Sequence, residues 1–119
     1  ERTMPRKIAL FAYRGETVCF VHVLLNALDL KERGHEVAVI LEGPATKTAV
    51  ELATDGVPFH DLYVKARSAG LIDCACKACS GKMGAQEGLK AQEIPLDGSM
   101  TGHPAMSRYL EAGYEIVNF

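Results

Sequence analysis

The apolar residues of this chain follow two alternating patterns. Short, largely apolar runs at Lys7–Ala12 and Glu36–Leu41 indicate strands buried on both faces, as in a parallel sheet. Between them, apolar residues recur at three- and four-residue spacing from Cys19 to Arg33, which predicts an amphipathic helix that Gly34 ends. This order of strand, helix and strand predicts a βαβ unit with a right-handed crossover.

The same alternation continues to the end of the chain. We expect helices over residues 46–53, 60–68, 81–91 and 105–112, strands over 71–74 and 114–119, and a short strand or loop at 94–96. Pro104 is expected at the first position of the last helix. The pattern predicts one domain over residues 1–119, with a three-layer α/β, Rossmann-like fold. Its sheet would be mostly parallel, with four to five strands and helices on both faces.

Charge and hydropathy exclude two classes of function. The net charge is only −2, and the 13 basic and 15 acidic residues are mixed along the chain, so no nucleic-acid-binding surface is expected. No apolar run is long enough to cross a bilayer. The opening segment from Glu1 to Lys7 has no secretory hydrophobic region, and we therefore expect a cytoplasmic protein.

Three of the four cysteines lie close together after the third expected strand. They are Cys74, Cys76 and Cys79, in a segment where a strand passes into a helix. The start of a helix offers unpaired N–H groups and the positive end of its dipole, which favour thiolate over thiol. In a reducing compartment such close spacing is more often catalytic or metal-binding than a disulfide framework.

The carboxyl ends of parallel strands meet at one edge of a sheet, where sites form. This places Cys19, Cys76, Cys79 and His103 at the same edge, although they are far apart in sequence. Cys74 and Cys19 are also explained as small packing residues of a strand and a helix. No such packing pattern explains Cys76 and Cys79, and we expect at least one of them to be functional.

The chain resembles the DsrE/DsrF-like family of small sulfur-relay proteins. The likeness lies in the opening strand Lys7–Ala12 with its following helix, in the apolar third strand that runs into the segment 76–84, and in the strand at the C-terminus. The resemblance implies a doubly wound sheet, homo-oligomers, and a cysteine that carries sulfane sulfur as a persulfide between donor and acceptor proteins. By position Cys79 corresponds to the sulfur-carrying cysteine, with Cys76 as the other candidate.

A sulfur-relay mechanism assigns a role to four residues. Cys79 would be the nucleophile, with Lys82 close enough to favour its thiolate. Cys76 could resolve the persulfide by forming a disulfide, and His103 would donate or accept a proton. No cofactor is needed for this possible sulfurtransferase activity.

Two other functions fit the same residues. Cys76 and Cys79, with one or two of Cys19, Cys74 and His103, would form a zinc site with three or four soft ligands. The chain could also be a non-catalytic subunit of an oligomer, with its thiols unreactive.

Overall fold

Five parallel strands form one sheet in the order β4-β3-β2-β1-β5. The computed structural model describes residues 4–119; residues 1–3, the start of the segment in which we expect no secretory leader, lie outside it. The strands are β1 (Lys7–Ala12), β2 (Glu36–Leu41), β3 (Ile72–Cys76), β4 (Leu96–Asp97) and β5 (Glu115–Asn118). The helices are α1 (Thr17–Glu32), α2 (Ala45–Leu52), α3 (His60–Ser68), α4 (Lys77–Lys82), α5 (Gln86–Ala91) and α6 (Met106–Glu111).

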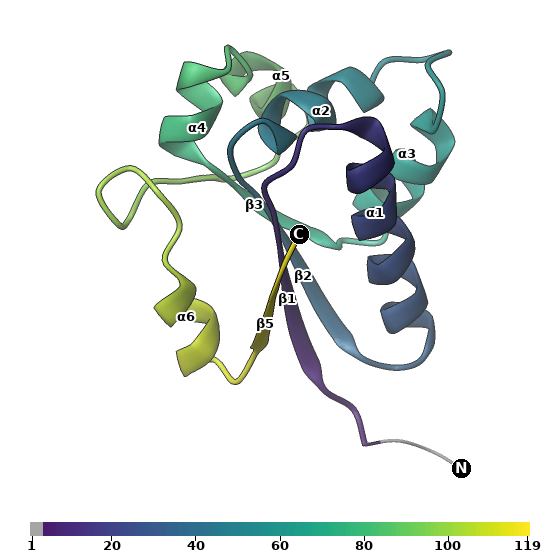
Figure 1. The fold of residues 1–119 in the computed structure, drawn as a ribbon, viewed down its shortest axis with the longest axis vertical. Coiled ribbons are helices and arrows are strands. Elements are labelled where there is room, and N and C mark those ends of the chain that lie inside the picture. Colours follow the sequence, from purple (N-terminus) through teal and green to yellow (C-terminus); the bar gives the residue numbers. More distant parts are fainter. Residues whose placement is uncertain (1–3) are drawn as a thin grey trace.

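The order of the strands fixes the path of the last connection. From β1 to β4 each strand is added beside the one before, but β5 pairs with β1 at the opposite edge from β4. The chain must therefore return across the whole sheet between residues 98 and 114. Figure 1 shows α6 in this connection, on the other side of the sheet from α1.

Apolar side chains cover both faces of the sheet. One face packs against α1, α2, α3 and α5 through buried residues that include Phe20, Ala49, Tyr63 and Leu89. The other face carries a smaller cluster beneath α6, in which the rings of Phe11 and Tyr109 meet edge to face at 5.5 Å. The structure thus confirms the three-layer α/β fold, and its sheet is wholly parallel.

The expected boundaries differ from the structure, most clearly at three places. The strand expected over residues 71–74 runs from Ile72 to Cys76. The helix expected over 81–91 is divided into α4 and α5, because Gly84 between them adopts a left-handed conformation with φ +69°. Pro104 does not begin the last helix, since Ala105 is still extended and α6 starts at Met106.

Within residues 4–119, every helix is too short or too polar to span a bilayer.

A buried tyrosine ties α3 to the end of α5. Tyr63 has no exposed surface, and its hydroxyl donates to Gln92 Oε1 at 2.6 Å. Burial raises the pKa of Tyr63 to about 12, against the opposing effect of the Arg67 charge. The folded protein therefore holds this proton at a pH where the unfolded chain has lost it.

We predict that alkaline pH destabilises the fold through Tyr63. Between about pH 10 and pH 12 the folded state binds more protons at this residue than the unfolded state, so the free energy of unfolding falls as pH rises. The complete loss is on the order of 2–3 kcal/mol. Urea unfolding of wild type and Tyr63→Phe at about pH 8 and pH 11 measures it.

The fall in the free energy of unfolding between the two pH values should be smaller in Tyr63→Phe than in the wild type. Replacing the exposed Tyr13 by Phe should leave this fall unchanged. Equal declines in wild type and Tyr63→Phe would contradict the prediction.

Candidate functional site

Two thiols and an imidazole meet at the carboxyl edge of the sheet. Cys76 ends β3, Cys79 lies in α4, and His103 lies in the loop before α6. His103 Nδ1 is 3.0 Å from Cys76 Sγ and 3.9 Å from Cys79 Sγ, and the three atoms all lie within 4.8 Å of one another. The structure therefore brings together three of the residues that sequence analysis placed at this edge.

The junction of β3 and α4 places one thiol inside the protein. Cys76 is fully buried and occupies the N-cap position of α4, where its sulfur accepts a hydrogen bond from the Cys79 backbone N–H at 3.3 Å. An N-cap side chain satisfies one of the free N–H groups of the first turn, and here sulfur takes the place of the usual oxygen. Cys79, one turn further along, is half-buried.

The loop that carries His103 is held against the start of α4. Gly102 O accepts a hydrogen bond from Ala78 N at 2.8 Å, while Met100 and His103 pair through both of their backbone groups. Gly102 has φ +95°, and a Cβ at this position would come within 3.2 Å of Ala78 Cβ. A glycine is needed here, because the conformation is left-handed and the approach to α4 is close.

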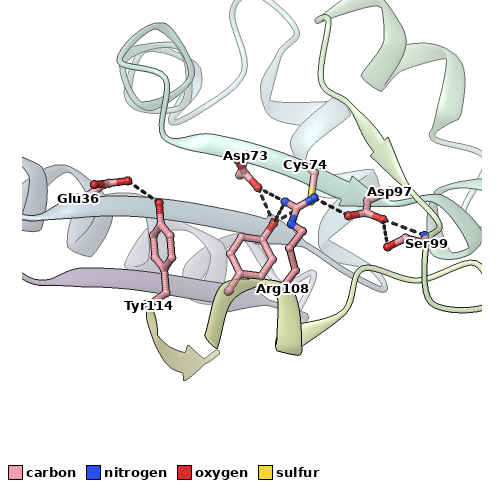
Figure 2. A network of polar contacts seen from close by, with 8 residues as sticks. Glu36, Asp73, Cys74, Asp97, Ser99, Arg108 and Tyr114 are labelled. Atoms are coloured by element: carbon pink, nitrogen blue, oxygen red, sulfur yellow. Dashed lines mark hydrogen bonds and ion pairs between the residues drawn. The ribbon is translucent and has the colours of Figure 1, made fainter. Parts of the chain in front are cut away.

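Polar contacts tie the same loop to β3, β4 and α6. Asp97, at the end of β4, accepts hydrogen bonds from the backbone and the side chain of Ser99 at 2.9 and 2.8 Å. Its other oxygen binds Arg108 of α6 at 2.9 Å, and Arg108 also binds Asp73 at 2.7 Å (Figure 2). Asp97 thus fixes the start of the loop, and Arg108 fixes the helix that follows it.

Burial controls the protonation of Cys76. Loss of water raises the pKa of the Cys76 thiol to about 12, and the Cys79 side chain and the charge of Glu42 act in the same direction. The hydrogen bond from the Cys79 backbone N–H lowers this pKa, but by less. At Cys76, burial therefore opposes the preference for the thiolate that is expected at a helix start.

Glu42 lies at the same edge of the sheet, although sequence analysis gave it no role. In the parallel pairing of β2 and β3, Ile40 lies opposite Cys74 and Leu41 opposite Ala75. Glu42 follows β2 directly, and continuing this register sets it beside Cys76. Burial raises the pKa of Glu42, and the nearby charge of His103 partly offsets this. Only the register of the two strands identifies this neighbour, and a single sequence does not give that register.

Three other candidates lie outside the cluster. Cys74 points to α6, where its buried sulfur lies 3.3 Å from the Tyr109 hydroxyl, and burial raises its pKa to about 11. Cys19 lies in the first turn of α1, half-buried, beside Arg14. Lys82 is exposed in the last turn of α4, and in residues 4–119 no hydrogen bond or ion pair joins it to a thiol.

Comparisons with known proteins place the chain among relatives and fix its fold. No protein-family model matches the chain. Over 54 residues, 45% of this chain and 88% of the relative, it is 33% identical to an uncharacterized protein of Archaeoglobus fulgidus. A conserved protein of unknown function from Bacteroides thetaiotaomicron, BT1422, has a similar structure, with a TM-score of 0.70 over 95% of this chain and 94% of that one. At 18% identity this likeness concerns the fold alone.

A longer match covers most of the sequence. The chain is 33% identical over 97 residues, 82% of its own length, to the uncharacterized protein MJ0733 of Methanocaldococcus jannaschii, and it covers 77% of that protein. The chain belongs to the family of MJ0733.

Proposed function

We propose that this protein carries sulfane sulfur as a persulfide on Cys79 and passes it to the thiol of another carrier. The observation that supports this most is the position of His103 Nδ1, within 3.9 Å of one half-buried and one fully buried thiol. A nucleophilic thiol needs a neighbouring base and access to its substrate. Cys79 has both, whereas Cys76 has the base and no exposed surface.

The uptake step is a displacement at sulfur. The Cys79 thiolate attacks the outer sulfur of a donor persulfide or polysulfide, a new S–S bond forms at Cys79, and the donor leaves as a thiolate. His103, through Nδ1, can take the proton that the Cys79 thiol loses. No electrons are lost from the pair of reactants, so uptake needs no further oxidant.

Two routes release the sulfur. An acceptor thiolate can attack the outer sulfur of the Cys79 persulfide, which returns Cys79 to its thiolate and leaves the acceptor as a persulfide. Alternatively, the Cys76 thiol gives its proton to His103 and attacks the inner sulfur, hydrosulfide leaves, and a Cys76–Cys79 disulfide forms. A dithiol protein must then reduce this disulfide, while Cys76, hydrogen-bonded to His103, is the thiol placed to form it.

The DsrE/DsrF resemblance is consistent with this proposal. It rests on the order of the elements and on the segment 76–84, and it implies sulfur donors, sulfur acceptors and a homo-oligomer as the partners of the chain. Lys82 would act in this setting only through its charge, because it makes no direct contact with the thiols within residues 4–119. A cytoplasmic, reducing environment would keep both thiols available.

We predict that sulfur uptake depends on Cys79. Native mass spectrometry after brief exposure to polysulfide should show one added sulfur atom per chain in the wild type and none in Cys79→Ser. Cys76→Ser should still take up sulfur, but it should not release hydrosulfide by forming a disulfide, because its resolving thiol is gone.

Cys19→Ser is the matched control, since this half-buried cysteine lies outside the cluster. It should take up sulfur as the wild type does. Sulfur uptake by Cys79→Ser at the wild-type rate would refute the proposal.

Alkylation should follow the exposure of the thiols. At neutral pH we expect iodoacetamide to modify Cys79 in the folded protein, while Cys74 and Cys76, at 2% and 0% exposure, are protected. Peptide mapping over time measures each site separately. In denaturant the protection should disappear, and protection of Cys79 equal to that of Cys74 in the folded protein would contradict the exposure argument.

A further inference from the structure

The same cluster has the composition of a metal site. Two cysteine sulfurs and one histidine nitrogen, from two segments of the chain, lie within 4.8 Å of one another. Zinc in proteins binds sulfur at about 2.3 Å and nitrogen at about 2.0–2.1 Å, so the ligand atoms of a tetrahedral site are roughly 3.5–3.8 Å apart. The distances of 3.0 and 3.9 Å from His103 Nδ1 to the two sulfurs lie on either side of this range. Small side-chain movements would therefore suffice.

We propose that Cys76, Cys79 and His103 bind a zinc ion and that the carboxylate of Glu42 is the fourth ligand. This goes beyond the sulfur-carrying function and does not depend on it. Binding joins Zn²⁺ to both sulfurs, to Nδ1 and to a carboxylate oxygen, and the two thiol protons pass to the solvent. Two thiolates, a neutral imidazole and a carboxylate give a donor set that suits zinc.

Glu42 directly follows β2, at the edge of the sheet that carries the three ligands. The residues two positions earlier, Ile40 and Cys74, are paired across β2 and β3 and share one face of the sheet. Because side chains alternate along a strand, Glu42 and Cys76 continue on that same face. The charge of Glu42 also acts on both Cys76 and His103.

The Glu42 side chain is also available for a ligand. It is half-buried, yet within residues 4–119 no hydrogen bond or ion pair engages its carboxylate. Placing a carboxylate partly out of water without a partner is costly, and a bound cation removes that cost. None of Cys74, Cys19 and Glu42 has its ligand atom within 4.8 Å of all three cluster atoms, so the Glu42 side chain would have to turn toward the cluster when the ion binds.

The test is a titration of the metal-free full chain with Co²⁺, followed by displacement with Zn²⁺. Co²⁺ reports its surroundings by absorption, through a thiolate charge-transfer band and through the visible bands of a tetrahedral ion. We expect one ion per chain with both signatures, and release of Co²⁺ when Zn²⁺ is added. Absence of stoichiometric binding, or octahedral spectra without the thiolate band, would overturn the site.

The variants separate the ligands from one another. Glu42→Gln should weaken binding by at least about 10- to 100-fold and change the visible bands, while the thiolate band remains. His103→Ala should weaken it further, and Glu51→Gln, an exposed acidic residue of α2, should bind as the wild type does. Unchanged affinity and spectra in Glu42→Gln would overturn Glu42 as the fourth ligand. Sulfur uptake by the metal-free chain is measured separately, so each proposal can fail without the other.

Discussion

The site exists because β4 and β5 lie at opposite edges of a parallel sheet. A parallel strand can be reached only by carrying the chain back over the sheet, and here the return starts at the carboxyl end of β4 and must cross three other strands to reach β5. Its first turn passes beside the end of β3, where Cys76 meets α4 (Figure 1). His103 comes to the thiols as a consequence of this path, although 24 residues separate it from Cys79.

Hydrogen bonds and ion pairs hold the connection from β4 to α6 in place. The Ala78 N–H to Gly102 O hydrogen bond joins the loop to α4, and Asp97 joins it to β4. On the far side, Arg108 connects Asp97 with Asp73 (Figure 2). The Tyr109 hydroxyl contacts both Asp73 and Arg108. The position of the imidazole is thus determined by α6 as well as by its own loop. A change in α6 would act on the site without touching either thiol.

Strands β1 and β2 were the most predictable, because each is a short apolar run buried over nearly its whole length, whereas β4 and β5 are shorter and more exposed. The order of the strands was not predictable, because apolar patterning says how a strand is buried and not which strand lies beside it. For this reason the sequence indicated that Cys76, Cys79 and His103 share an edge but gave no role to Glu42, whose place next to Cys76 follows from the β2–β3 register. The division between α4 and α5 was missed because the helical pattern continues through Gly84, while its φ of +69° ends the helix.

Burial gives the two cysteines different chemistry at nearly the same place. Cys76, at the end of β3, lies inside the protein, while Cys79, three residues later, is half-buried. Burial favours the neutral thiol at Cys76 in the absence of a cation, and a bound zinc would reverse this preference, because a positive charge stabilises both thiolates. Zinc would also occupy the Cys79 lone pair that attacks a persulfide. Sulfur transfer and zinc binding would therefore compete for the Cys79 thiolate. Only chains without zinc would be able to accept sulfur.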